Sequence, residues 1–185
     1  MELERWAREV ARATLAESVP RRWSHVQGVA DRAREAAALF DEDGELLVAA
    51  ALLHDIGYAP DLVDTGFHPI DGARYLRNTD APTRLVNLVA HHSSAVLEAE
   101  LRGLSAELTE FEEEKTPVQD ALWWADMTTT PYGSQTTVTE RVREIQARYG
   151  PEDTVSCFIR WAWPELKGAV ERTEVRMREA GIGYE

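Results

Sequence analysis

The side chains best suited to chemistry in this chain are its histidines. Five are present, all in the first half of the sequence: His25, His54, His68, His91 and His92. His54 is followed directly by Asp55 at the end of an apolar run rich in alanine and leucine. An imidazole and a carboxylate buried there without partners would be unfavourable, because both groups would lose water and gain no bonds in return. A metal ion that takes both as ligands removes this penalty, so the doublet indicates a metal site.

The donor types narrow the choice of metal. Imidazole and carboxylate ligands together favour Fe, Mn, Co, Ni or Zn over Mg or Ca. Other interpretations stay open, since a lone histidine on a helix is commonly a hydrogen-bonded structural residue. His54–Asp55 could be a helix-capping pair, and Asp126 could be a capping acid. We favour the metal site because the histidines and two acids all fall at the edges of predicted helices around one apolar centre.

The elements that must position these side chains are predicted to be helices, because apolar residues recur at steps of three and four. The segment 45–56 is apolar nearly all round and should be the buried central helix. Gly57 would let the backbone turn away after the doublet. Breaks are expected at Gly150–Pro151 and Pro164, and residues 93–116 are acidic and less regular. The expected helices cover residues 3–14, 21–40, 45–56, 68–78, 81–92 and 117–126, with two or three more over 137–180.

No segment shows the alternation of a strand, so the sequence predicts an all-α fold. We expect one compact multi-helix domain over residues 1–185, with the metal site between the central helices.

Charge and composition limit the partners. The formal net charge is −13, which should repel a nucleic-acid backbone but leaves room for a small phosphorylated substrate beside bound cations. The single cysteine, Cys157, cannot form an internal disulfide, and the first residues lack the pattern of a signal peptide. The longest apolar run is too short for a membrane span. We therefore expect a cytoplasmic protein without membrane or nucleic-acid partners; the six tryptophans could fill the core or a homodimer interface.

Two stretches of sequence resemble a known family. Residues 23–30 read WSHVQGVA and residues 49–57 read AAALLHDIG. With Asp126 downstream, these stretches resemble the HD-domain superfamily of metal-dependent phosphohydrolases, over roughly residues 20–130. The resemblance implies metal ligands at His25, His54, Asp55 and Asp126.

Members of this superfamily with a second metal add two histidines, which the resemblance places at His68 and His92. His91 could replace His92 as a ligand or contact the substrate beside it. The resemblance implies that Asp55 bridges two ions and that metal-activated water attacks phosphorus. On this view the catalytic residues are Asp55, His91 and Asp126, and the substrate contacts are Arg22, Arg74, His91 and Thr129.

The expected substrate is a nucleotide or another small phosphorylated metabolite, cleaved at a phosphoester or phosphoanhydride bond. Tyr58 stands where the nucleoside monophosphatase branch of the superfamily carries a glutamate, which makes that branch a poorer match. Two alternatives remain: a di-iron oxygenase, which uses the same types of ligand, and a regulatory module that only binds metal.

Overall fold

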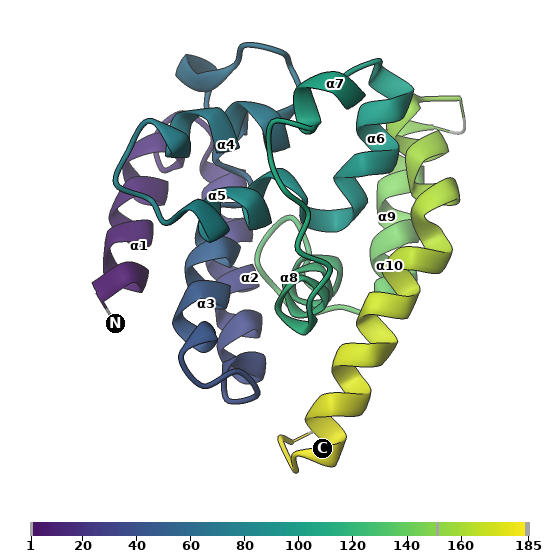
Figure 1. The fold of residues 1–185 in the computed structure, drawn as a ribbon. Helices are drawn as coiled ribbons and strands as arrows, with labels where there is room; N and C mark the ends of the chain where they lie inside the picture. Colours follow the sequence, from purple (N-terminus) through teal and green to yellow (C-terminus); the bar gives the residue numbers. More distant parts are fainter. Residues whose placement is uncertain (1, 151, 184–185) are drawn as a thin grey trace.

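The computed structural model describes residues 2–150 and 152–183. Within these residues the regular structure is helical and no strand is formed; an isolated bridge joins Thr129 to Gln135. The predicted all-α fold is therefore confirmed (Figure 1). The α-helices are α1 (Glu2–Leu15), α2 (Pro20–Ala37), α3 (Asp43–Leu53), α4 (His68–Arg77), α5 (Thr83–Ala90), α6 (Ala95–Arg102), α7 (Ser105–Leu108), α8 (Pro117–Met127), α9 (Val138–Tyr149) and α10 (Thr154–Glu179). Short 3₁₀ turns are η1 (Ile56–Tyr58), η2 (Pro60–Leu62) and η3 (His92–Ser94).

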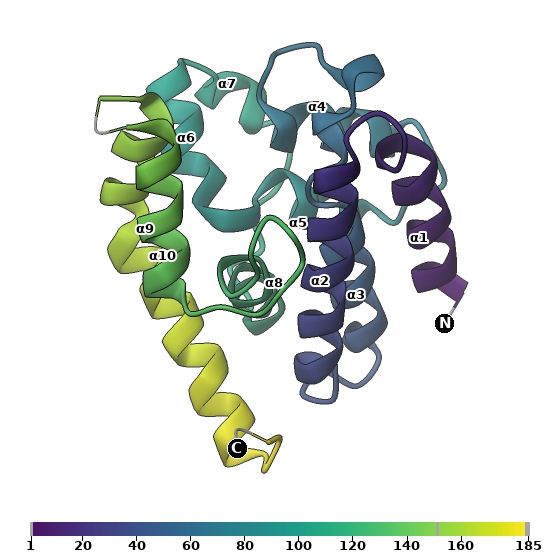
Figure 2. The same cartoon turned by 180° about the vertical axis from the view of Figure 1, so that it is seen from behind.

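Helix α3 forms the centre of the bundle, as its apolar sequence predicts. Every residue from Leu46 to Leu53 is buried, which leaves no solvent-facing stripe. Helices α1, α2, α5 and α8 all pack against α3. In Figures 1 and 2, α8 is seen nearly end-on between the α2–α3 pair and α10, with α1 and α10 on opposite sides. The C-terminal end of α3 therefore points its last residues into the interior of the protein.

The predicted break at Pro164 is wrong, because α10 runs through this proline from Thr154 to Glu179. Proline removes one backbone donor from a helix, which usually disfavours it in a helix interior. Pro164 is exposed, so water can reach the backbone at this point. The opposite face of α10 is buried from Phe158 to Met177 and packs along α8 and α9, which stabilises the helix on both sides of the proline. The other predicted break falls between α9 and α10; its Gly150 follows α9, and its Pro151 lies outside the described residues.

The segment between α5 and α8 contains more helix than its sequence suggested, in α6 and α7. Helix α5 ends earlier than expected, at Ala90, and the chain turns sharply after it. Ser93 and Ser94 have φ angles of 48° and 61°, a left-handed conformation that non-glycine residues rarely adopt. This turn follows His91 and His92 and leads into α6.

Crossing a bilayer takes a longer apolar stretch than any helix in the described part of the chain provides.

Candidate metal centre

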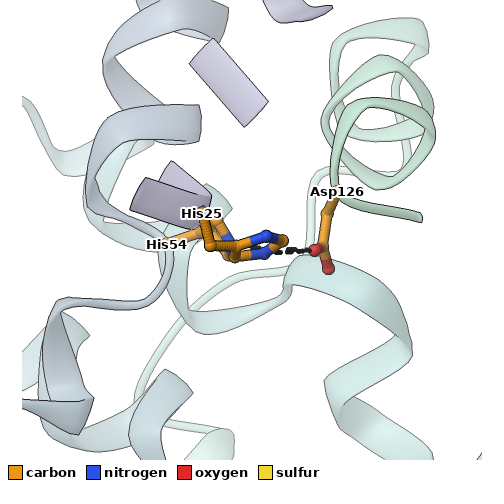
Figure 3. A group of neighbouring side chains, drawn as sticks. All are labelled: His25, His54 and Asp126. Carbon is orange, nitrogen blue, oxygen red and sulfur yellow. Dashed lines mark hydrogen bonds and ion pairs between the residues drawn. The ribbon is translucent and has the colours of Figure 1, made fainter. Parts of the chain in front are cut away.

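Three side chains from three helices meet at one point, and we call them the first triad: His25, His54 and Asp126. His25 lies in the first half of α2, His54 follows α3 directly, and Asp126 lies in the last turn of α8 (Figure 3). The Nε2 atom of His25 lies 3.0 Å from Oδ1 of Asp126, and Nε2 of His54 lies 3.8 Å from the same oxygen. One donor atom from each residue lies within 4.8 Å of the others, and all three side chains are buried, so the group could hold a metal ion.

A second triad, Asp55, His68 and His92, lies directly beside the first. Oδ1 of Asp55 is 3.3 Å from Nε2 of His68 and 4.0 Å from Nε2 of His92. The two Nε2 atoms are 3.1 Å apart. Because His54 and Asp55 are neighbours in sequence, the triads share a backbone link, and Nε2 of His54 lies 3.6 Å from Oδ1 of Asp55. Two adjacent groups of three donors could therefore hold two ions.

Main-chain carbonyls fix the orientation of three of these histidine rings. Nδ1 of His25 lies 2.9 Å from the oxygen of Thr130, and Nδ1 of His92 lies 2.7 Å from that of Val89. Nδ1 of His54 lies 2.8 Å from the oxygen of Ala51. A carbonyl only accepts hydrogen bonds, so each Nδ1 carries a hydrogen, and the neutral ring presents the lone pair of Nε2 to the triads. Metal-binding histidines are typically held in this way.

The free donor atoms fit a bound cation. Nε2 of His54 is buried and has no hydrogen-bond partner. Nε2 of His25 faces a carboxylate oxygen, an arrangement that requires either a proton or a metal ion between two lone pairs. The contact between Nε2 of His68 and Nε2 of His92 likewise requires a proton or a metal ion between the two nitrogens. The residues present therefore fit a metal centre better than a structural network of hydrogen bonds.

Charge around Asp55 favours its ionised form. Burial alone would raise the pKa of Asp55, but the Arg22 guanidinium, with Nη1 2.7 Å from Oδ2, and the nearby histidines hold this pKa well below its usual range. Burial lowers the pKa of His68 to about 3, against the opposing influence of Asp55, so that ring is neutral at neutral pH. Burial also lowers the pKa of His92. An ionised carboxylate with two neutral imidazoles is the protonation state that metal binding needs.

Close backbone packing brings His68 to the site. His68 is the first residue of α4, and its ring stacks on Tyr58 with the ring centroids 4.0 Å apart. A Cβ atom on Gly57 would lie 2.1 Å from the His68 carbonyl oxygen and 2.7 Å from the Gly72 nitrogen. Gly57 lies in the 3₁₀ turn η1, so the backbone turns after the doublet as the sequence predicts, without a left-handed φ. The glycine is needed because α4 approaches too closely for any side chain.

Alanine at Gly57 should lower metal occupancy of the second triad and leave the first loaded. The new Cβ would push the start of α4, and with it His68, away from Asp55, and such overpacking typically costs about 1–3 kcal/mol of stability. Metal content per chain and the unfolding temperature measure both effects. Gly168→Ala is the matched control, since its Cβ would meet only the end of the flexible Arg172 side chain, at 3.0 Å. A Gly57→Ala protein that retains two ions would contradict this account.

Asp71 supports the same segment and was not recognised from the sequence. Its buried carboxylate accepts hydrogen bonds from the backbone and hydroxyl of Thr65, at 2.9 and 2.7 Å, and from the backbone of Gly66, at 3.1 Å. These bonds hold the loop that leads into His68. An aspartate in the first turn of α4 was the available signal, but an acid at a helix start usually needs no tertiary explanation.

The structure does not bring His91 to the triads. Its Nε2 lies 2.9 Å from the carbonyl oxygen of Phe111, and its own carbonyl accepts a hydrogen bond of 3.0 Å from Nε1 of Trp123. These contacts hold the loop before α8 against the end of α5. The expected catalytic and substrate contacts of His91 have no support in this geometry, because His91 and His92 diverge at the helix end.

Of the other predicted substrate contacts, Arg22 lies in the site and two do not. Arg74 is paired with Asp64, at 3.0 Å, and with Glu110 on the surface. The hydroxyl of Thr129 is fully buried and donates to the carbonyl of Ala125 at 2.8 Å. Both side chains are thus engaged in local structure and do not line the cavity beside the triads.

A cavity of about 90 Å³ opens beside the triads. Asp55, His68, His92 and Asp126 form its floor, and Arg22 stands at its edge with its guanidinium 3.8 Å from the Tyr58 ring centroid. Ser93, in its left-handed conformation, donates a hydrogen bond to Oδ2 of Asp126. Residues of α9 and α10 complete the wall, and none of these was predicted from the sequence. The potential ligands therefore face a space that a small molecule could enter.

Fold and site together define an all-helical protein with a buried histidine and aspartate cluster suited to divalent metal ions. The family model of the HD domain matches residues 22–130, and the chain belongs to this family of the metal-dependent hydrolase superfamily. The match spans α2 to the loop after α8, and so contains all six residues of the two triads. Neither the curated proteins nor the solved structures compared with the chain gave a match.

Proposed function

We propose that this protein is a metal-dependent phosphohydrolase that cleaves a phosphoester or phosphoanhydride bond of a small phosphorylated molecule. The observation that carries the proposal is the pair of adjacent triads, joined by His54 and Asp55, at the floor of a cavity. Two divalent ions held side by side are a recurring arrangement in enzymes that hydrolyse phosphate esters.

The first triad would hold one divalent transition-metal ion, and the second triad would hold another. Such ions, when bound, lower the pKa of a water molecule and offset negative charge on phosphoryl oxygens. Fe, Mn, Co, Ni and Zn suit these nitrogen and oxygen donors.

The protein's own groups bind and orient the substrate in this proposal. The planar guanidinium of Arg22 can donate two parallel hydrogen bonds to phosphoryl oxygens, and its stacking on Tyr58 holds its plane. Ser93 donates to Asp126 and so fixes the carboxylate in the first triad. The buried surroundings of the triads limit bulk water, which strengthens these electrostatic contacts.

Anaerobic purification followed by metal analysis and turnover assays should give two transition-metal ions per chain and release of phosphate without oxygen. The panel would contain small phosphomonoesters and nucleotides, each tested with and without oxygen. Chelation should abolish phosphate release, and the added metal should restore it. Oxygen consumption coupled to substrate oxidation, with no phosphate release, would contradict the proposal and indicate a di-iron oxygenase. Metal binding without turnover of any compound would contradict it too, and would indicate a regulatory module.

A further inference from the structure

One wall of the cavity comes from the part of the chain that the family match does not cover. Arg141 and Ile145 of α9 line it together with Phe158 and Ile159 of α10, and we call these four residues the α9–α10 wall. Figures 1 and 2 show both helices side by side, across α8 from the α2–α3 pair. The family match ends at residue 130, so this wall is specific to what the chain adds after the HD domain.

Arg141 is the charged member of the wall. Its side chain is 7% exposed and lines the cavity, and Nη1 donates a hydrogen bond of 2.6 Å to Glu144, which does not line it. Nε of Arg141 is buried without a hydrogen-bond partner in the described structure. An unsatisfied donor of this kind is costly unless something binds to it. The Arg141 side chain lines the cavity, so an anion bound there would meet its positive charge.

Arg22 borders the same cavity from the α2 side, and Arg148 of α9 also lines it, paired with Glu144. In a chain with a net charge of −13, these three guanidinium groups offset the carboxylates of Asp55, Glu98 and Asp126 that line the same space. The positive charge of Arg141 is among the influences that hold the pKa of Asp126 below its usual range, after burial, which opposes the shift, and the contacts with His25 and His54. Arg141 and Asp126 also line the same cavity.

The rest of the wall is apolar. Ile145, Phe158 and Ile159 are 8%, 5% and 3% exposed. A hydrocarbon group that enters beside them exchanges water for these side chains, and each methylene buried in this way strengthens binding roughly fourfold.

The size of the cavity limits the occupant further. Its volume of about 90 Å³ is well below the roughly 300 Å³ at the lower end of typical ligand pockets. A phosphoryl group with a short hydrocarbon chain suits this space, whereas a nucleoside does not.

We propose that the α9–α10 wall determines substrate specificity: Arg141 and Arg22 bind the phosphoryl group, and Ile145, Phe158 and Ile159 bind a short apolar group. The substrate class is then a small phosphomonoester of an apolar alcohol. This inference rests on the proposed phosphohydrolase function, but its test measures binding and not turnover, and its two phosphonates cannot be hydrolysed.

Calorimetric titration of the metal-loaded protein with propylphosphonate, methylphosphonate and AMP tests the apolar part without any substitution. Two additional buried methylenes should make propylphosphonate bind about fifteenfold more tightly than methylphosphonate. AMP should bind more weakly than propylphosphonate. Equal affinity for the two phosphonates, or tighter binding of AMP, would overturn the proposed specificity.

Arg141→Gln tests the anion contact, with Arg143→Gln as the matched control. Arg143 lies on the exposed face of the same helix, so both variants remove one positive charge from α9. Methylphosphonate affinity should fall about tenfold or more in Arg141→Gln, as expected for a lost charge-assisted bond, and should change less than twofold in Arg143→Gln. Metal content should stay unchanged in both. Arg141→Lys keeps the charge and should recover part of the affinity, which separates an anion contact from damage to α9.

Equal weakening by Arg141→Gln and Arg143→Gln would show a general effect of charge and overturn the role of Arg141. The two proposals fail in different ways. Phosphonate binding that depends on Arg141, in a protein that hydrolyses no phosphoester, would leave the wall standing and remove the proposed function. Hydrolysis of a phosphoester at a rate that does not depend on Arg141 would support the proposed function and overturn the proposed role of the wall.

Discussion

Alanine in place of Asp55 should abolish phosphate release and reduce the metal content of the protein. The Asp55 carboxylate lies next to both triads. Its Oδ1 is 3.3 Å from Nε2 of His68, in the second triad, and 3.6 Å from Nε2 of His54, in the first. Its removal takes away the negative charge that attracts cations to this point. Metal ions contribute several kcal/mol to the stabilisation of a phosphoryl transition state, so the rate should fall about a thousandfold or more.

Asp61→Ala is the matched control for this substitution, since Asp61 lies exposed in η2, a few residues after the doublet. It removes the same charge and should leave metal content and rate unchanged. Metal analysis and phosphate release measure the effect, and circular dichroism shows whether the helices persist. Full metal occupancy in the Asp55→Ala protein would show that this carboxylate is only a helix-end acid.

His92→Ala should leave one ion per chain and remove most of the turnover. The first triad keeps all three of its donors, whereas the second loses an Nε2 that lies 3.1 Å from that of His68. Loss of one of two cooperating ions should slow phosphate release on the order of a hundredfold or more. Metal stoichiometry and the rate constant, measured on the same sample, test both parts of the expectation.

His91→Ala provides the comparison, because its side chain is adjacent in sequence and serves a different purpose in the structure. It should retain both ions and lose about 1–3 kcal/mol of stability, since the Phe111 carbonyl is left buried without its donor. Loss of an ion from His91→Ala but not from His92→Ala would reverse the assignment. Unchanged metal content in both variants would indicate a site with a single ion.

The metal site was predictable because its most informative feature is local. His54 and Asp55 are adjacent, so their proximity follows from the sequence without knowledge of the fold. The end of the apolar segment 45–56 then places them inside the protein. The all-α fold follows from helical periodicity in the same way.

The features that depend on tertiary contacts could not be predicted. Periodicity could not choose between His91 and His92, because the helix ends before them and two left-handed serines set the later path. The turn at Gly57 was predicted, whereas the close approach of α4, which leaves no room for a Cβ there, was not. Arg141 lies in a segment with no recognisable motif, and only folding brings it to Asp126. A helix break was predicted at Pro164, but α10 continues because the exposed position of this proline removes most of its energetic cost to the helix.

The carbonyls that orient the histidine rings have a consequence for how this site can diverge. Ala51, Val89 and Thr130 act through their main chains, and every amino acid has a carbonyl group to offer. Substitutions at Ala51 and Val89 are therefore limited by packing, and at Thr130 also by the hydrogen bonds that its hydroxyl accepts from the backbone of Tyr132 and Ser134, but none of them changes the tautomer of a ring. The path of the main chain at these positions sets the orientation of the histidine rings. Related chains could therefore change all three side chains and still present the same Nε2 lone pairs to a metal.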